Sequence, residues 1–335
     1  MKRLALVGPY ADSPLAHLGC WRGMCSEEHS ETPTLFDEAA RFFPGAKIEL
    51  ERGVVAGANE CVATAAYEKP DRAAIARAVR VARRADVVVV ALGETGRSSG
   101  ECRSRRDIGL SPAQEALVDA LAATGKPLVG LVLAGRPLAF PATAEKLDAM
   151  LWLWQGGSRG AQAAWELVTG KANPSGRLAM TFPRAVGQIP VYYNAQPRCR
   201  TGYDEYQDLV GENGPWFPFG AGLSYTTFEY GKVRLAARPR GGLGAEVRVK
   251  NTGKRAGAET VIWYLSDLES TSTQPARRVV GFEKIPLEPG EAKTVRLSLS
   301  RKDLAAMQPD GTRRFEPGAF EVSASLRASA RIDVR

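Results

Sequence analysis

The stretch ADVVVVALGETGRSSGECRSRRDIGLSPAQEALVDAL, residues 85–121, decides the fold of the first half of the chain. It opens with an unbroken apolar run, Val87–Leu92, which is typical of a strand covered on both faces in a parallel sheet. The segment Ser111–Gln114 then predicts the start of a helix, with serine as N-cap and proline in the first helical position. The loop between them therefore lies at the carboxyl end of a parallel strand, where open α/β sheets bind their ligands.

The same alternation of strands and helices extends outward from this stretch. Further strands are predicted at 4–8, 47–51, 127–133, 150–154 and 177–182, and helices near 33–43 and at 71–84, 111–123 and 161–170. This spacing indicates a layered α/β fold with a mainly parallel sheet, an α/β sandwich, to which we assign residues 1–196.

The second half of the chain has an all-β pattern. The segments 245–251 and 294–300 alternate apolar and polar residues, which places Val247 and Val249, and Val295, Leu297 and Leu299, on inward faces. Turns are predicted at 251–253, 288–290 and 316–318, each of which contains glycine. We therefore expect a β-sandwich over residues 224–335, joined to the first domain by a connector at 197–223.

Composition favours a soluble globular protein. The chain has 335 residues, 44% of them apolar, and a formal net charge of +8 spread along its length. The most basic segment, 71–84, is expected to be a solvated helix face, so no nucleic-acid partner is predicted. No membrane span is expected, and the N-terminal apolar stretch is too short for a signal peptide. The chain as it stands is expected in the cytoplasm, or in the periplasm or outside the cell if a preceding segment carries an export signal.

The cysteines do not describe a disulfide framework, because there are five and their spacing is irregular. One short segment contains His17, Cys20, Cys25 and His29, which could in principle bind zinc tetrahedrally. The segment lacks a paired C-x2-C knuckle, so we expect reduced loop cysteines and no cofactor, with the metal site left as an open alternative.

Several longer segments carry a family resemblance. Up to residue 230 they are LALVGPYADS (4–13), LGCWRG (18–23), VVVVALGE (87–94), GRPL (135–138), NPSGRLAMTFPRAVGQIPVYYN (173–194) and FPFGAGLSYTTFEY (217–230). In the second half they are VKNTGKRAGAETV (249–261), RRVVGFEKIPLEPGEAKTV (277–295) and FEPGAFEV (315–322). Together they resemble the C-terminal half of a glycoside hydrolase family 3 enzyme of the bacterial β-glucosidase type. The resemblance implies an α/β sandwich domain followed by a fibronectin type III-like domain.

The resemblance also implies a site. Retaining glycosidases use a nucleophile and a general acid/base whose carboxyl groups lie about 5–5.5 Å apart. In this family the acid/base glutamate lies on a loop of the α/β sandwich domain, and the segment G-E-x6-E-x3-R-x-D-I assigns that role to Glu101. It places Glu94 at the strand end as a substrate-binding candidate, and Arg105 where it orients Glu101 or a substrate hydroxyl. Trp21 matches a tryptophan that flanks the sugar outside the scissile bond in some relatives.

Other interpretations of these residues stay open. Glu101 could simply pair with Arg103, Arg105 or Arg106 on a solvated loop, and Trp21 could be a core residue. Cys102 is disfavoured as a thiol nucleophile because no histidine lies near it in sequence. Nucleotide binding is disfavoured because the loop after Leu92 has neither G-x4-G-K-[ST] nor G-x-G-x-x-G.

No segment resembles the family's N-terminal (β/α)8 barrel, which carries the nucleophilic aspartate. We therefore expect the chain to supply the acid/base half of a β-glycosidase that acts on a β-linked glucoside or related saccharide. The barrel would be a partner in cis or in trans, and the isolated chain would be inactive. A non-catalytic carbohydrate-binding or barrel-partner module is the alternative.

Overall fold

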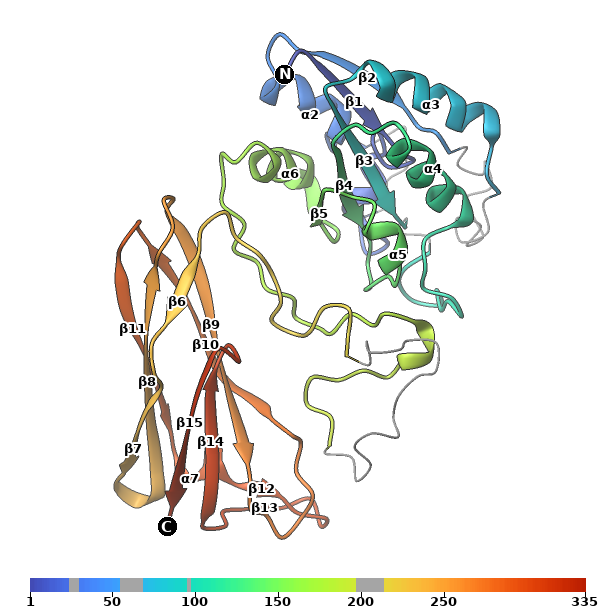
Figure 1. Ribbon diagram of the computed structural model, residues 1–335. Helices are drawn as coiled ribbons and strands as arrows, with labels where there is room; N and C mark the ends of the chain where they lie inside the picture. The colour runs from blue at the N-terminus through green and yellow to red at the C-terminus, as the bar shows by residue number, and fades with distance from the viewer. Residues whose placement is uncertain (24–29, 55–68, 95–97, 197–213) are drawn as a thin grey trace. The chain divides into compact units, whose positions relative to one another are not determined.

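The computed structural model of the chain describes residues 1–23, 30–54, 69–94, 98–196 and 214–335 (Figure 1). The chain forms two compact units. The first consists of Met1–Ala172 and Phe182–Ile189, and the second consists of Asn173–Thr181 and Pro190–Arg335.

The first unit is built on a five-stranded sheet in the order β2-β1-β3-β4-β5. The strands are β1 (Arg3–Val7), β2 (Lys47–Glu51), β3 (Val87–Gly93), β4 (Leu128–Leu133) and β5 (Ala149–Trp152). Every pairing is parallel. The central strand β3 is buried from Val88 to Leu92, as its apolar run predicts. The predicted parallel α/β fold is confirmed.

Helices cover both faces of this sheet (Figure 1). They are α1 (Pro14–Leu18), α2 (Leu35–Phe42), α3 (Arg72–Arg84), α4 (Pro112–Ala122), α5 (Pro141–Ala144) and α6 (Gly160–Val168), with short 3₁₀ turns at Gly157–Arg159 and Val186–Gln188. Helix α3 packs beside α4, and α2 beside α6. The Trp165 indole donates to the Leu35 carbonyl at 2.8 Å, which joins α6 to α2. Ser111 caps α4 by accepting from the Gln114 amide at 3.3 Å, as predicted.

The prediction of a strand at 177–182 is wrong. The Leu178 amide donates to the Ala221 carbonyl at 2.8 Å, and the Leu178 carbonyl accepts from Gly220 at 2.7 Å. This segment therefore pairs with residues 220–221 and not with the parallel sheet. Phe182 packs edge-on against Trp152, with ring centroids 4.6 Å apart, so its apolar character reflects an aromatic cluster.

The second unit contains an antiparallel β-sandwich. One sheet has the order β10-β9-β14-β15, and the other has β11-β8-β6 with β7 also paired to β8. The strands are β6 (Phe228–Tyr230), β7 (Arg234–Arg238), β8 (Gly242–Asn251), β9 (Gly257–Asp267), β10 (Arg278–Leu287), β11 (Ala292–Leu299), β14 (Gly318–Ala324) and β15 (Ala328–Val334), with a small β12 (Ala306–Met307) and β13 (Arg313–Arg314) pair, helix α7 (Arg301–Leu304) and a 3₁₀ turn at Pro239–Gly241. The five predicted inward residues of β8 and β11 all lie in or against the shared core.

A buried ion pair joins the segment Asn173–Thr181 to this sandwich. The Arg177 guanidinium binds the Glu259 carboxylate on β9, and the two side chains are 7% and 2% exposed. The Tyr230 hydroxyl donates to the other Glu259 oxygen at 2.8 Å. Asn173 donates to the Ala256 carbonyl at 2.8 Å. These contacts explain why this segment belongs to the second unit although the sequence suggested the first.

Two arginines of the basic helix α3 form ion pairs with glutamates of the neighbouring strand β2. Arg84 binds Glu49 at 2.8 Å, and Arg77 lies 3.4 Å from Glu51, both on β2. These pairs agree with a solvated helix face. None of the helices in the described ranges is both long enough and apolar enough to cross a membrane.

Candidate active site

The candidate site begins where β3 ends. The Gly93 amide donates to the Gln114 side-chain oxygen at 2.8 Å, and the Gln114 amide group donates back to the Gly93 carbonyl at 3.0 Å. The Glu94 amide donates to Leu133 on β4 at 2.9 Å. A Cβ atom at Gly93 would overlap the Leu133 carbonyl, so only glycine allows this approach. The backbone of Glu94 is therefore fixed by both β4 and α4.

The Glu94 carboxylate is the buried charge of the site, with its side chain 1% exposed. One oxygen lies 3.1 Å from Arg105 Nη1 and the other 2.9 Å from Arg136 Nε. Burial raises the pKa of Glu94 above its ordinary value, and the two guanidinium groups act in the opposite direction. A buried carboxylate between two cations is a structural anchor, because removal of any member leaves an uncompensated charge.

The same arginines hold the following loop. Arg136 donates to the Ser98 carbonyl and, at 2.8 Å, to the Arg103 carbonyl. Arg105 donates to the Gly109 carbonyl at 3.0 Å. These acceptors flank Glu101 on both sides in the sequence. The Glu94 anchor therefore fixes the loop that presents Glu101.

Glu101 occupies the tip of this loop. The Arg103 amide donates to the Gly100 carbonyl at 3.1 Å, which closes a turn around Glu101 and Cys102. The Glu101 side chain is exposed. Among the described residues it takes part in no ion pair or side-chain hydrogen bond. The structure therefore does not bear out the alternative that Glu101 pairs with Arg103, Arg105 or Arg106: no such pair forms among the described residues, and Arg105 binds Glu94.

The loop that carries Trp21 meets the turn at Gly100. Gly100 has φ +130°, and a Cβ there would overlap Cys20 Sγ and lie 3.8 Å from Trp21 Nε1. Trp21 is 74% exposed, which rules out the alternative of a core residue. The structure thus brings an exposed aromatic ring and an exposed carboxylate, Glu101, onto neighbouring loops.

Two functional candidates received no role from the sequence. Arg136 lies in the quoted GRPL segment, and Gln155 follows β5. A Cβ at Gly19 would overlap the Gln155 side chain, and one at Gly135 would lie 2.9 Å from Gln155 Nε2. Loops after β1, β4 and β5 therefore meet at Gln155. Both residues lie beyond the carboxyl ends of parallel strands, and this position is the sequence signal that could have identified them.

The proposed metal cluster is tested only in part. His17 is fully buried, and neither ring nitrogen has a hydrogen-bond partner within the part of the chain that the structure describes. Burial lowers the pKa of His17 to about 4. Cys20 is a free thiol, while Cys25 and His29 lie outside the described residues. No group of three His, Cys, Asp or Glu side chains in the described ranges is placed to bind a metal. The four-residue zinc site stays an untested alternative to the predicted reduced loop cysteines.

Comparison with known proteins identifies the class. Residues 1–225 match the glycosyl hydrolase family 3 C-terminal domain. Residues 259–326 match the fibronectin type III-like domain. The chain belongs to glycosyl hydrolase family 3.

Its relatives include glycosidases of two kinds. The chain is 37% identical, over 95% of its length, to a periplasmic beta-glucosidase of Salmonella typhimurium, of which it covers 44%. It is 37% identical, over 76% of its length, to a beta-xylosidase of Formosa agariphila, of which it covers 35%. The crystal structure of a beta-glucosidase from Listeria innocua in complex with isofagomine superimposes with a TM-score of 0.85 and 31% identity, covering all of this chain and 46% of that one. The chain thus spans less than half the length of these relatives.

Proposed function

We propose that this chain supplies the acid/base part of a retaining β-glycosidase, with Glu101 as the general acid/base. The observation that carries the proposal is the exposed Glu101 carboxylate, which has no ion-pair partner among the described residues and lies at the tip of a loop that is anchored on both sides. Membership of glycosyl hydrolase family 3 supports the reaction class. The names of the relatives support a β-linked glucoside or related saccharide as substrate.

The arrangement of charges suits this role. A general acid must be protonated before it donates, and a bound guanidinium would oppose protonation. Arg105 of this loop and Arg136, which follows β4, are both bound to Glu94. Glu94 therefore engages both cations, and among the described residues neither of them pairs with Glu101. In this proposal the two carboxylates of the arginine-rich loop have different roles: Glu94 binds arginines and anchors the loop, and Glu101 transfers the proton.

The remaining residues take supporting roles. We assign Glu94, Arg105 and Arg136 to positioning, because the side chains of Glu94 and Arg105 are buried against one another. The predicted contact of Glu94 and Arg105 with substrate stays a prediction. Trp21 offers an exposed ring next to the Glu101 turn, and an aromatic face suits the C–H-rich face of a sugar.

The covalent step requires a second carboxylate. In a retaining mechanism the nucleophile attacks the anomeric carbon while the acid protonates the leaving oxygen, and the same residue then deprotonates the attacking water. We propose that the nucleophile comes from a (β/α)8 barrel in cis or in trans, as the family implies. One relative is named as periplasmic, and we propose that location for an assembly that carries an export signal.

The test uses a complete enzyme, assembled from this chain and a family barrel. Glu101→Ala should lower turnover of substrates with poor leaving groups by about 10²–10⁴-fold, because their departure needs a proton. Dinitrophenyl glycosides should still form the glycosyl-enzyme, since dinitrophenolate departs unaided. Azide should then restore turnover by replacing the base-activated water.

Glu145→Ala is the matched control, because Glu145 is an exposed glutamate of the same unit. It should leave both substrate classes unchanged. Equal slowing of activated and unactivated substrates by Glu101→Ala, without azide rescue, would remove the acid/base assignment. Unchanged turnover would favour a non-catalytic module.

A further inference from the structure

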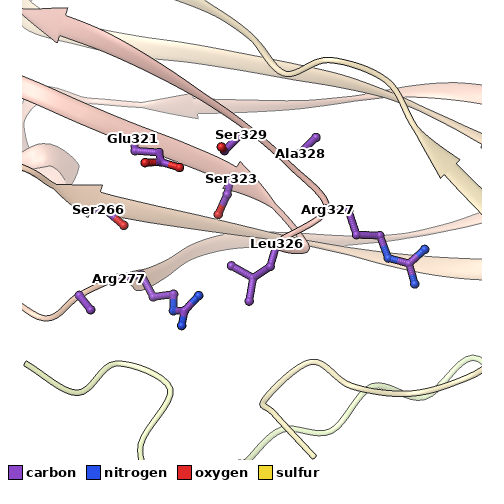
Figure 2. Close-up of a pocket in the computed structure, with 9 residues that line it drawn as sticks. Ser266, Arg277, Glu321, Ser323, Leu326, Arg327, Ala328 and Ser329 are labelled. Atoms are coloured by element: carbon purple, nitrogen blue, oxygen red, sulfur yellow. The ribbon is translucent and has the colours of Figure 1, made fainter. Parts of the chain in front are cut away.

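A pocket of about 380 Å³ opens on the β-sandwich, where β14 turns into β15 (Figure 2). Ser266, Glu321, Ser323 and Leu326 are among the residues that line it, together with Arg277, which lies just before β10. Its volume falls within the range of small-molecule sites. The residues assigned to catalysis are not part of it.

The pocket follows from the pattern of side chains on β14. Phe320, Val322 and Ala324 point into the core, so Glu321 and Ser323 point to the outer face of the sheet. Strand register places Ser323 opposite Ser329 and Glu321 opposite Ser266. Three short serine side chains thus lie close together among larger neighbours, which leaves a depression in the face.

The lining has unused hydrogen-bonding capacity. No hydroxyl of the three serines has a partner among the described residues. Arg277 donates from Nε to the Tyr193 carbonyl at 3.3 Å, and its two terminal nitrogens have no partner in that same part of the chain. Glu321 binds Arg331 through one oxygen at 3.1 Å, so its charge is already matched. Arg327, which also lines the pocket, donates to the Phe228 carbonyl at 3.3 Å and lies over the Tyr230 ring. Among the described residues, the pocket therefore offers two arginines that form no ion pair, and several hydroxyl groups.

The hairpin turn at its rim has an unusual backbone. Ser325 and Leu326 have φ of 49° and 55°, a region that side chains other than glycine and asparagine rarely adopt. Ser325 is held there, because its Oγ accepts from the Ile262 amide at 3.0 Å. Leu326 is nonetheless 48% exposed at the pocket. Figure 2 shows Leu326 and Arg277 projecting toward the same side of the sheet. A strained backbone that presents an apolar side chain beside a guanidinium whose terminal nitrogens have no partner among the described residues points to a binding role.

We propose that this pocket binds a carboxylate-bearing sugar, a hexuronate unit, as a second saccharide site. The terminal nitrogens of Arg277 suit one carboxylate in a bidentate pair. The serine hydroxyls and the second Glu321 oxygen suit ring hydroxyls, and Leu326 suits an apolar sugar face. The proposal concerns binding alone and does not depend on the role of Glu101.

The test measures binding of glucuronate, glucose, acetate and inorganic phosphate to the whole chain by calorimetry or by amide chemical shifts. Glucuronate should bind with a dissociation constant in the millimolar range, and glucose and acetate should each bind about tenfold more weakly, because each supplies only part of the interactions. Arg277→Gln should weaken the binding of glucuronate by about tenfold or more, since the charge-assisted pair between the guanidinium and the carboxylate is lost. Ser323→Leu, which fills the depression, should abolish binding.

Arg234→Gln is the charge-matched control, because Arg234 is an exposed arginine of the other sheet. It should bind glucuronate as the parent chain does. Thermal unfolding of each variant checks that it folds. Absence of glucuronate binding, equal binding of phosphate or acetate, or an unchanged affinity in folded Arg277→Gln would each overturn the proposal.

Discussion

Arg105 Nη1 lies 3.1 Å from Glu94 Oε2, and among the described residues Arg105 contacts no atom of the Glu101 carboxylate. Arg105 is nearer in sequence to Glu101 than to Glu94, yet it pairs with Glu94. Glu94 is buried and must be compensated, whereas Glu101 is exposed to solvent and needs no partner. Burial therefore decides which carboxylate receives the guanidinium.

Glu94→Gln should destabilise the first unit. The substitution keeps the shape but leaves Arg105 and Arg136 without their carboxylate, and loss of one member of a buried pair costs about 3–5 kcal/mol. Because Arg136 is partly exposed, we expect the lower end of this range. Denaturant unfolding gives the free energy, with Glu145→Gln as the exposed control. In a complete enzyme Glu94→Gln should not respond to azide, and azide rescue would contradict a positioning role.

The isolated chain should fold but not hydrolyse glycosides. A retaining mechanism requires a nucleophile as well as an acid/base, and we place the nucleophile on a barrel. The purified chain is assayed with aryl β-glucoside, β-xyloside and β-N-acetylglucosaminide. Clear turnover of any of these would require a nucleophile within these residues.

Trp21→Ala should separate stability from binding. The side chain is 74% exposed, so the free energy of unfolding should change by less than about 0.5 kcal/mol. In a complete enzyme the KM should rise if the ring contacts the sugar. Trp165→Ala is the contrasting variant. Because Trp165 is fully buried, this substitution should lower the free energy of unfolding by about 3–5 kcal/mol. A large loss of stability in Trp21→Ala would place that ring in a packing role.

His17 should make the first unit sensitive to acid. Its pKa is about 4 in the folded chain and near 6.5 when unfolded, so the unfolded state binds the proton more readily. The stability contribution of neutral His17 is complete above pH 6.5 and is lost as the pH falls toward 4, by up to about 3 kcal/mol.

The measurement for His17 is the free energy of unfolding as a function of pH, compared with His17→Asn. The variant has no group that titrates in this window at that position, so the difference between the two curves should shrink as the pH falls. Parallel curves from pH 7 to pH 4 would show that the ring is accessible to protons in the folded chain.

Much of the fold could be predicted because its signals are local. The run Val87–Leu92 and the cap at Ser111 each specify an element from a few neighbouring residues. The site was predictable only in part. Arg136 reaches Glu94 from 42 positions away in sequence, and no periodicity reports such a contact. The segment 177–182 was misassigned because its apolar residues serve an aromatic cluster and a non-sheet pairing.

The partners of Glu259 restrict where the β-sandwich can be separated from the rest of the chain. The polypeptide passes between the two units at Ala172–Asn173, at Thr181–Phe182 and at Ile189–Pro190. A sandwich cut out at Ser224 would leave behind Arg177 and Asn173, and with them the cation that neutralises Glu259. The segment 224–335 is therefore not an independent domain. Gene fusions that transplant it must carry residues 173–181 with it, or must replace Glu259 by an uncharged side chain.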